Sequence, residues 1–210
     1  MNVEKQKEKI NNDVIKEHYF SKKYFSLNRL YSYSNQINEV LSLSPKKILE
    51  IGIGSGFVAN SLKFLNIKVV TMDNKEDLRP DIIADIRNIP TQNEKFDIVL
   101  CCEVLEHLPF EDFSKCLLEM KKNSKGKIII SLPDSSKKIR FFIPKIGYKI
   151  FCIPFLRKKI RNDHSHFWEI NRKGFDLKKI EKEIKKNGFK IEKNYILFNN
   201  PAHRFFVLSF

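Results

Sequence analysis

The sequence predicts a doubly wound α/β fold, and three observations lead to this prediction. Apolar runs of strand length occur at residues 47–52, 68–73, 81–85, 96–102 and 126–132. Helical patterns lie between some of them, at 57–65 and 110–122. The runs are continuously apolar, as is typical of parallel strands that are covered on both faces. Ligand-binding residues of such sheets follow the carboxyl ends of the strands.

Residues 26–43 precede the first strand and are predicted to form a helix. Ser26 is a possible cap, and Pro45 ends the helix. The residues predicted on its apolar face are Leu27, Leu30, Tyr31, Ile37 and Leu41. We therefore expect an N-terminal helical cap over residues 1–45, followed by one domain over residues 46–210.

The C-terminal part has a different pattern. Residues 175–188 are predicted to form a helix that Asp176 caps and Gly188 ends, with Leu177, Ile180 and Ile184 on one face. Two strand-like segments follow, at 189–198 and 203–210, separated by the turn residues "NNPA". This arrangement predicts a terminal antiparallel strand pair.

Composition limits the function classes. A hydrophobic content of 42% excludes a largely disordered chain. The 39 Lys and Arg against 25 Asp and Glu give a net charge of +14, which favours an anionic partner such as nucleic acid, anionic lipid or a phosphorylated substrate. A lysine-rich, solvated surface explains the same charge without any partner.

Cysteine usage and hydropathy indicate a cytoplasmic protein. The four cysteines show no CxxC spacing, so we expect reduced, intracellular thiols. The charged start "MNVEKQKEKINND" is not followed by the apolar stretch of a secretory signal. The most apolar segment, residues 141–156, contains two prolines and two lysines and is too short to span a bilayer.

The stretch "ILEIGIGSGF", residues 48–57, is the strongest candidate for a binding site. It contains three of the chain's 7 glycines, Gly52, Gly54 and Gly56. They follow the first strand and open the first helix, so backbone N–H groups and a helix N-terminus face a ligand there. The spacing differs from the G-x-G-x-x-G of dinucleotide binders and lacks the lysine of a P-loop. Glu50 could meet a ligand cation or hold the loop.

The run from Glu50 to Gly56 resembles the first motif, E/D-x-G-x-G-x-G, of the class I S-adenosylmethionine-dependent methyltransferases. The resemblance is detailed over residues 46–133 and implies a Rossmann-like, mostly parallel seven-stranded sheet with S-adenosylmethionine as cofactor. By this resemblance Asp73 accepts hydrogen bonds from both ribose hydroxyls. The resemblance also places Asp85 near the adenine amino group and Ile86 beside the adenine ring. The alternatives are that Asp73 caps a turn and Asp85 caps the segment "IRNIP". The implied cofactor-binding residues are Glu50, Gly52, Gly54, Gly56, Asp73, Asp85 and Ile86.

The fourth strand leads into "CCEVLEHLP", which would bring Glu103, Glu106 and His107 onto one face if it coils. This stretch resembles the ubiquinone-pathway O-methyltransferases and the small-RNA 3′-end methyltransferases, where a matching E-x-x-E-H group binds a divalent cation. The resemblance thus implies a Mg²⁺ or Mn²⁺ site, the latter fitting imidazole better. The alternative is that these residues shape the pocket and cap the next helix.

A second polar cluster, "NDHSHFWEI" at 162–170, contains His164 and His166. The family often carries a histidine and aromatic group here that lines the mouth of the acceptor site. A surface histidine pair is the alternative. We take Glu103, His107 and His166 as the catalytic candidates facing the acceptor.

Residues 135–166 form a predicted basic insert, because no acid lies between Asp134 and Asp163. Apolar and aromatic residues alternate with nine basic ones, and Pro144 and Pro154 are expected to break the segment into short helical pieces. Such an amphipathic segment is typical of an anchor on an anionic membrane. A lid packed on the core is the alternative, and a surface that follows a phosphate backbone is another. The basic residues are Lys137, Lys138, Arg140, Lys145, Lys149, Arg157, Lys158, Lys159 and Arg161.

Together these patterns predict an S-adenosylmethionine-dependent methyltransferase that acts on a small-molecule or lipid-like acceptor, at oxygen, and that contacts an anionic membrane peripherally. One alternative is an RNA 2′-O-methyltransferase. Another is a membrane-surface binding module without activity. The sequence leaves the acceptor, the methylated atom and the oligomeric state open.

Overall fold

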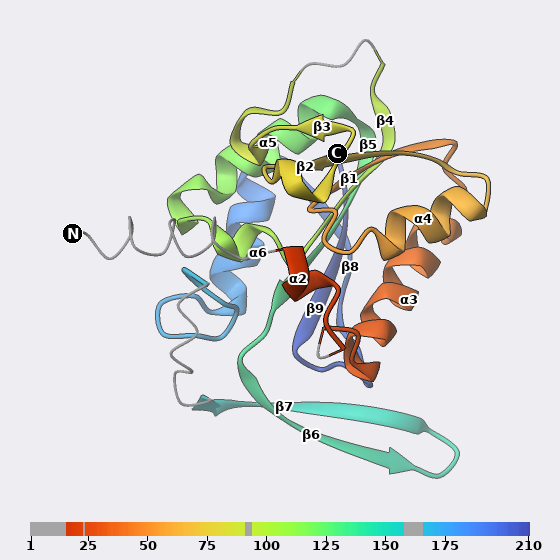
Figure 1. Ribbon diagram of the computed structural model, residues 1–210. Helices are drawn as coiled ribbons and strands as arrows, with labels where there is room; N and C mark the ends of the chain where they lie inside the picture. Colours follow the sequence, from red (N-terminus) through yellow and green to blue (C-terminus); the bar gives the residue numbers. More distant parts are fainter. Residues whose placement is uncertain (1–15, 23, 91–93, 158–165) are drawn as a thin grey trace.

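The computed structural model describes residues 16–22, 24–90, 94–157 and 166–210 (Figure 1). Its centre is a seven-stranded sheet in the order β3-β2-β1-β4-β5-β9-β8. Strands β1 to β5 are parallel, whereas β9 runs antiparallel to both β5 and β8. This confirms the predicted fold class and the terminal antiparallel pair. The strands are β1 Lys47–Ile51, β2 Lys68–Asp73, β3 Ile82–Ile83, β4 Phe96–Cys102, β5 Ser124–Pro133, β8 Lys190–Ile196 and β9 His203–Ser209.

Helices cover both faces of this sheet (Figure 1). One apolar cluster joins α3 and α4 to the sheet through Tyr33, Val40 and Leu62. A second, larger cluster joins α5 and α6 to the opposite face through Phe113, Trp168 and Ile180. The helices are α2 Lys16–Tyr19, α3 Leu27–Ser42, α4 Phe57–Phe64, α5 Phe113–Asn123 and α6 Leu177–Lys186. Short 3₁₀ turns are η1 Glu76–Leu78, η2 Ile86–Asn88, η3 Leu105–His107 and η4 Phe110–Asp112.

Strand β1 lies between β2 and β4, so the order of the strands reverses beside it. The chain turns towards one side of the sheet after β1 and towards the other when it enters β4. Ligands of open α/β sheets bind at this reversal, outside the carboxyl ends of the strands. The glycine stretch after β1 and the "EVLEH" stretch after β4 therefore both lie at the expected edge.

The predicted helices occur, but α3 is rotated from the predicted face: Leu30 and Ile37 pack against the core as predicted, whereas Tyr31 and Leu41 are exposed. Its buried residues are Ser32, Tyr33, Gln36 and Val40, whereas Leu27 is 73% exposed. Polar contacts explain the rotation, because the Ser32 hydroxyl bonds to His203 Nδ1 at 2.9 Å and accepts from Asn200. The predicted cap of α6 is confirmed, since the Asp176 carboxylate accepts the Lys179 N–H.

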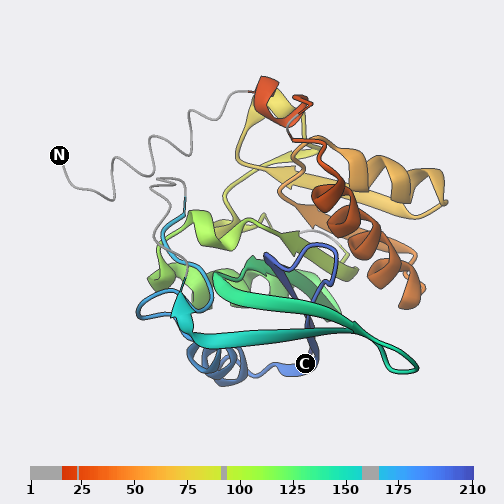
Figure 2. The same cartoon turned by 90° about the horizontal axis from the view of Figure 1, so that it is seen from below.

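The basic insert does not form the predicted helical pieces. Residues Ser136–Ile143 (β6) and Gly147–Arg157 (β7) instead form an antiparallel hairpin that is separate from the main sheet. Pro144 lies in its turn, where Lys145 and Gly147 have positive φ. The segment is rich in Ile and Phe, whose β-branched and aromatic side chains favour a strand over a helix. In Figure 1 the hairpin extends away from the sheet, and Figure 2 shows it from below.

Several predictions fall on residues outside the described ranges. These are His164, Lys158, Lys159 and Arg161, together with the first part of the N-terminal cap. Within the described residues, no helix is both long and apolar enough to cross a bilayer. All four cysteines are described, and each is a free thiol.

Candidate cofactor and acceptor site

The glycine loop between β1 and α4 needs glycine for two separate reasons. Gly52 and Gly54 have φ of 83° and 51°, in the left-handed region that residues with a Cβ adopt only at a cost. A Cβ at Gly52 would also lie 2.4 Å from Val104 Cγ2. Gly56, with φ of 72°, is the N-cap of α4, and no side chain caps that helix. The unpaired N–H groups of its first turn remain available for a ligand.

Asp73, at the carboxyl end of β2, fixes this loop. One carboxylate oxygen accepts the Ile53 N–H at 3.0 Å, and the other accepts the Lys75 N–H at 3.0 Å. Burial raises the pKa of Asp73, and these hydrogen bonds offset part of the rise. Each carboxylate oxygen has a second lone pair, so the side chain can still accept hydroxyl donors. Asp73 thus both caps its turn, as the alternative prediction stated, and faces the expected ligand edge.

Two tyrosines from the N-terminal segment, Tyr19 and Tyr24, lie over the glycine loop. We call this pair the tyrosine roof. A Cβ placed on Gly54 would lie 3.3 Å from the Tyr24 hydroxyl and 3.6 Å from Tyr19 Cδ1. The Arg29 guanidinium lies 4.1 Å from the centre of the Tyr24 ring. Burial raises the pKa of Tyr19 to about 12, and the negative charge of Asp73 adds to that rise. The roof therefore places one cation and two hydroxyls near the glycines.

Polar atoms without partners point to a ligand at the same edge. Among the described residues, Glu50 Oε2 and Ser55 Oγ are buried and make no hydrogen bond. Burial raises the pKa of Glu50 to about 8, although Lys63 partly opposes the rise. A buried carboxylate that lacks a donor is costly, and a ligand ammonium would relieve that cost.

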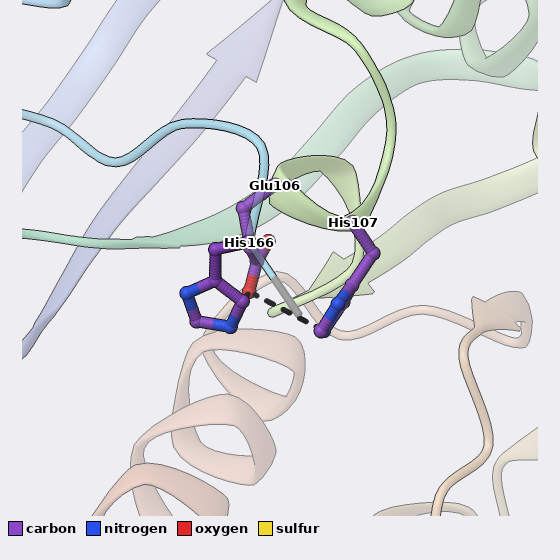
Figure 3. A group of neighbouring side chains, drawn as sticks. All are labelled: Glu106, His107 and His166. Carbon is purple, nitrogen blue, oxygen red and sulfur yellow. Dashed lines mark ion pairs between the residues drawn. The ribbon is translucent and has the colours of Figure 1, made fainter. Parts of the chain in front are cut away.

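A second group of polar side chains gathers beyond β4, where Glu106, His107 and His166 point towards one another (Figure 3). Their ligand atoms all lie within 4.8 Å of one another. Glu106 Oε1 is 4.0 Å from Nε2 of each histidine. Both carboxylate oxygens of Glu106 are buried and make no hydrogen bond with the described residues.

Burial and charge shift the proton affinities of this cluster. Burial raises the pKa of Glu106 to about 8, and the charge of Glu103 adds to the rise. Burial alone would lower the pKa of His166, but its hydrogen bond to Glu169 and the charge of Glu106 outweigh this effect and raise the pKa to about 9. Both shifts favour the protonated forms of Glu106 and His166 near neutral pH.

Backbone contacts hold His166 in this position. The Phe167 N–H donates to the Glu106 carbonyl at 2.8 Å, and the Trp168 indole donates to the Leu108 carbonyl at 3.1 Å. His166 Nδ1 lies 3.0 Å from Glu169 Oε1. These bonds attach the segment before α6 to the turn after β4, about sixty residues earlier in the chain.

Sequence comparisons with known proteins agree with a methyltransferase site at this edge of the sheet. The profile of the family described as "Methyltransferase domain" matches residues 49–130, from β1 into β5. A ubiquinone biosynthesis O-methyltransferase of Marinobacter nauticus is 21% identical over 196 residues, covering 78% of this chain and 80% of that protein. These matches support a class I S-adenosylmethionine-dependent methyltransferase.

One further sequence relative and two solved structures of similar fold are also methyltransferases by name. The ubiquinone biosynthesis O-methyltransferase of Pseudomonas putida is 30% identical over 90 residues, so the alignment covers 36% of this chain but only 39% of that relative. The solved magnesium protoporphyrin IX methyltransferase of Synechocystis PCC 6803 has a TM-score of 0.65 at 14% identity, covering 100% of this chain and 97% of that one. A methyltransferase from Clostridium acetobutylicum has a TM-score of 0.63 at 14% identity, covering 92% and 98%.

Asp85 caps η2, which is the alternative to adenine binding that the sequence predicted for this residue. Its carboxylate accepts the Arg87 N–H at 2.8 Å and forms an ion pair with the Arg87 guanidinium at 2.6 Å. Burial alone would raise the pKa of Asp85, but the hydrogen bonds from Arg87 hold it below its ordinary value. Ile86 is buried in the core. The contact of both residues with adenosine stays a prediction.

Glu103 does not share a face with Glu106 and His107 as predicted, because the segment after β4 is not a continuous helix. Glu103 has a φ of 55° and lies before η3. Its carboxylate instead accepts the Ser131 hydroxyl at 2.9 Å and lies 3.4 Å from His203 Nε2. The third member of the methyltransferase's cluster is His166, which the sequence placed at the acceptor mouth but not in the metal group.

Sequence reasoning missed Tyr19, Tyr24, Arg29 and His203. The first three precede the motif by at least twenty residues, and His203 follows the hairpin and α6. Only the folded sheet brings β9 beside β5 and places the N-terminal segment over the glycine loop. An aromatic pair before a helix was the one available signal.

Proposed function

We propose that the methyltransferase transfers the methyl group of S-adenosylmethionine to an oxygen atom of a small-molecule or lipid-like acceptor. The observation that carries this proposal is the cluster of Glu106, His107 and His166 at the carboxyl edge of β4 (Figure 3). A hydroxyl acceptor must lose its proton when the methyl group is transferred, so a proton acceptor is needed beside it. One similar protein is named for ubiquinone biosynthesis and another for magnesium protoporphyrin IX. Both names point to small-molecule acceptors.

The cofactor residues of the proposal are those of the glycine loop and Asp73. Gly52, Gly54 and Gly56 allow the left-handed turns that present the loop backbone to the cofactor, and Asp73 accepts the ribose hydroxyls. We place the amino group of the methionyl part at Glu50, whose buried Oε2 lacks a hydrogen-bond donor. We place the methionyl carboxylate at Arg29, whose guanidinium stacks on Tyr24 above Gly54. Asp85 and Ile86 complete the adenosine end.

Methyl transfer from a sulfonium ion disperses charge, so alignment and the exclusion of water supply much of the rate. In the proposed reaction Glu106 takes the hydroxyl proton. Its raised pKa makes the ionised form of Glu106 a stronger base than an exposed carboxylate. His166 and His107 line the acceptor side and orient the hydroxyl. Glu103 supports this edge through Ser131 and His203, without a direct role in proton transfer.

The same three side chains offer a donor set for a divalent cation. One carboxylate and two imidazoles lie within 4.8 Å of one another, and the Glu106 oxygens lack hydrogen-bond donors. Imidazole ligands suit Mn²⁺ better than Mg²⁺. Such an ion would polarise the acceptor oxygen. Titration of the protein with Mn²⁺, followed by electron paramagnetic resonance, tests this: a bound signal that Glu106→Gln removes supports the site, and a spectrum of free Mn²⁺ alone rejects it.

The RNA alternative depends on net charge and on the "EVLEH" resemblance. One labelling experiment separates the acceptor classes. The protein is incubated with methyl-tritiated S-adenosylmethionine and a cell extract, which is then divided into lipid, small-metabolite and RNA fractions. We expect label in the lipid or small-metabolite fraction, and none with Gly54→Arg. Label confined to RNA would overturn the acceptor class, and label in no fraction would overturn the activity.

A further inference from the structure

The hairpin β6–β7 carries exposed apolar side chains that the methyltransferase fold does not use. Ile139, Phe142, Ile146 and Phe151 are 54%, 60%, 61% and 60% exposed. Monomeric proteins rarely expose such a group together unless it has a partner. We define these four residues as the hairpin patch.

The register shows how the patch is oriented. Ile139 pairs with Phe151, and Phe141 pairs with Lys149, so these four side chains lie on one face of the hairpin. The rings of Phe141 and Phe151 stack at 5.2 Å across the strands. Phe142 lies on the other face, next to the tip, and Ile146 lies in the turn, so both add exposed apolar surface at the end of the hairpin.

The opposite face is attached to the body of the protein. Lys138 forms an ion pair with the buried Asp134 at 3.1 Å, and Arg140 donates to the Phe198 carbonyl at 3.1 Å. Asp134 is also paired with Arg204 of β9 at 2.8 Å. Because one face is fixed in this way, the face with Ile139 and Phe151 points outward.

The charge around the patch is of one sign. Residues 135–157 contain no acid, and Lys137, Lys145 and Lys149 are exposed. A surface that combines apolar side chains with lysines only complements the interface of an anionic bilayer, because the lysines meet the headgroups while the apolar side chains enter between them. A protein partner of mixed charge would call for acids as well.

The hairpin also begins beside the acceptor cluster. The Ser135 hydroxyl donates to the Glu169 carboxylate, whose other oxygen contacts His166 Nδ1 at 3.0 Å. The Ser135 N–H donates to the Ile170 carbonyl at 2.9 Å. Ser135 immediately precedes β6, so the hairpin begins next to the Glu169–His166 pair of the proposed acceptor site.

We propose that the hairpin patch docks the methyltransferase onto the surface of an anionic membrane, so that a lipid-like acceptor enters the site from the bilayer. This inference rests on the proposed function for the identity of the acceptor, but the docking itself does not require methyl transfer. Binding is therefore measured separately from activity.

Vesicle sedimentation tests the docking. The full chain is mixed with vesicles of phosphatidylcholine alone or of equal parts phosphatidylcholine and phosphatidylglycerol. We expect selective binding to the anionic vesicles. Lys145→Glu with Lys149→Glu should weaken it by about twentyfold or more, because each basic residue near the surface contributes about fivefold. Ile139→Ser with Phe151→Ser should weaken it by at least about tenfold.

Matched controls carry the same changes elsewhere. Phe64→Ser removes a side chain that is 86% exposed on α4, and Lys182→Glu with Lys185→Glu reverses two lysines on α6. Both should bind vesicles like the wild type. Equal binding by the hairpin variants, or no binding of the wild type to anionic vesicles, would overturn the proposal. Binding to an RNA oligonucleotide that the hairpin variants lose, together with no binding to either vesicle type, would assign the hairpin to RNA and overturn the proposal.

Cofactor binding separates this inference from the proposed function. The hairpin variants should bind S-adenosylhomocysteine normally, which also shows that they fold. Gly54→Arg should lose cofactor binding and still sediment with anionic vesicles. If Gly54→Arg loses both, docking depends on the cofactor site, and the independent anchor proposed here is wrong.

Discussion

The carboxylate of Asp73 accepts the backbone N–H of Ile53 at 3.0 Å. This bond connects the end of β2 to the glycine loop after β1, twenty residues earlier in the chain. The residue expected to bind the ribose is thus also the residue that shapes the loop beneath the methionyl part. Changes at Asp73 are therefore expected to affect both the loop and the ligand.

The substitution Asp73→Asn tests this double role. The amide keeps the size of the side chain, but its nitrogen cannot accept a hydrogen bond from Ile53 or Lys75. We expect the affinity for S-adenosylhomocysteine to fall by about tenfold or more, because a charge-assisted hydrogen bond contributes about 1.5–3 kcal/mol. The thermal shift that the ligand produces measures this. Glu111→Gln, an exposed acid in η4, should keep the full shift.

Arg29→Ala tests the assignment of the methionyl carboxylate. We expect the variant to bind S-adenosylhomocysteine about 10- to 100-fold more weakly, since a charged hydrogen bond is lost. Its affinity for 5′-methylthioadenosine, which lacks the amino-acid part, should be unchanged. Calorimetry with both ligands provides the comparison. An equal loss for the two ligands would show that Arg29 acts by supporting the tyrosine roof, and no loss would remove it from the site.

Gly52→Ala tests the close approach of β1 and the turn after β4. The new Cβ would lie 2.4 Å from Val104 Cγ2, in addition to the cost of a φ of 83°. We expect a loss of about 2–4 kcal/mol in the free energy of unfolding, measured by chemical denaturation. Gly147→Ala is a matched control, since its φ is 87° but nothing lies within 4 Å of the new Cβ. It should cost only about 1 kcal/mol. Adding Val104→Ala to Gly52→Ala should recover part of the loss, and no recovery would argue against the contact.

Glu106→Gln tests the proposed proton acceptor. We expect kcat to fall by about 10²- to 10⁴-fold, while binding of S-adenosylmethionine stays within about twofold of the wild type. His166→Asn should lower kcat by a smaller factor, because it orients the acceptor and does not take the proton. These values come from single-turnover assays with the acceptor fraction found by labelling. An unchanged kcat for Glu106→Gln would show that alignment alone suffices.

The lowered pKa of Asp134 predicts that the stability of the protein depends on pH. Burial alone would raise its pKa, but the charges of Lys138 and Arg204 and a hydrogen bond from Ser136 lower it to about 2. Because the folded pKa is below the ordinary value of 3.8, the stabilisation is complete above that value and is lost as the pH falls towards 2. The shift corresponds to about 2 kcal/mol.

The comparison of wild type with Asp134→Asn isolates this contribution. Denaturation at neutral pH should show a loss of about 3–5 kcal/mol in the variant, because Lys138 and Arg204 then remain buried without their anion. The difference between the two proteins should shrink between pH 4 and 2. A difference that does not change with pH would contradict the assignment. Asp77→Asn, at an exposed acid in η1, should follow the wild-type curve.

Local patterns predicted the parallel sheet well, because each strand is a continuous apolar run. Strand β2 occupies residues 68–73 and β4 occupies 96–102, as the patterns predicted. The predicted face of α3 was only partly right, because the buried Ser32 and Gln36 are polar, and hydropathy assigns such residues to solvent. The helical pieces predicted for the insert were wrong, because the prolines were interpreted as helix breakers. Pro144 instead lies in the turn of a hairpin.

The candidate site was predictable only where its residues are close in the sequence. The glycine loop, Asp73 and the "EVLEH" stretch each follow a strand end, so the fold class alone placed them at one edge. The partners of Glu103 are different, since Ser131 and His203 come from β5 and β9. Pairing across the sheet determines those contacts, and no spacing in the sequence encodes it. The tyrosine roof is another long-range contact of the same kind.

The central claim is that S-adenosylmethionine binds at the glycine loop. Isothermal titration of the protein with S-adenosylhomocysteine tests it most directly. We predict saturable binding of one ligand per chain for the wild type and no binding for Gly54→Arg, because the new side chain would occupy the space beneath Tyr19 and Tyr24. Absence of binding to the wild type, or undiminished binding to Gly54→Arg, would contradict the account.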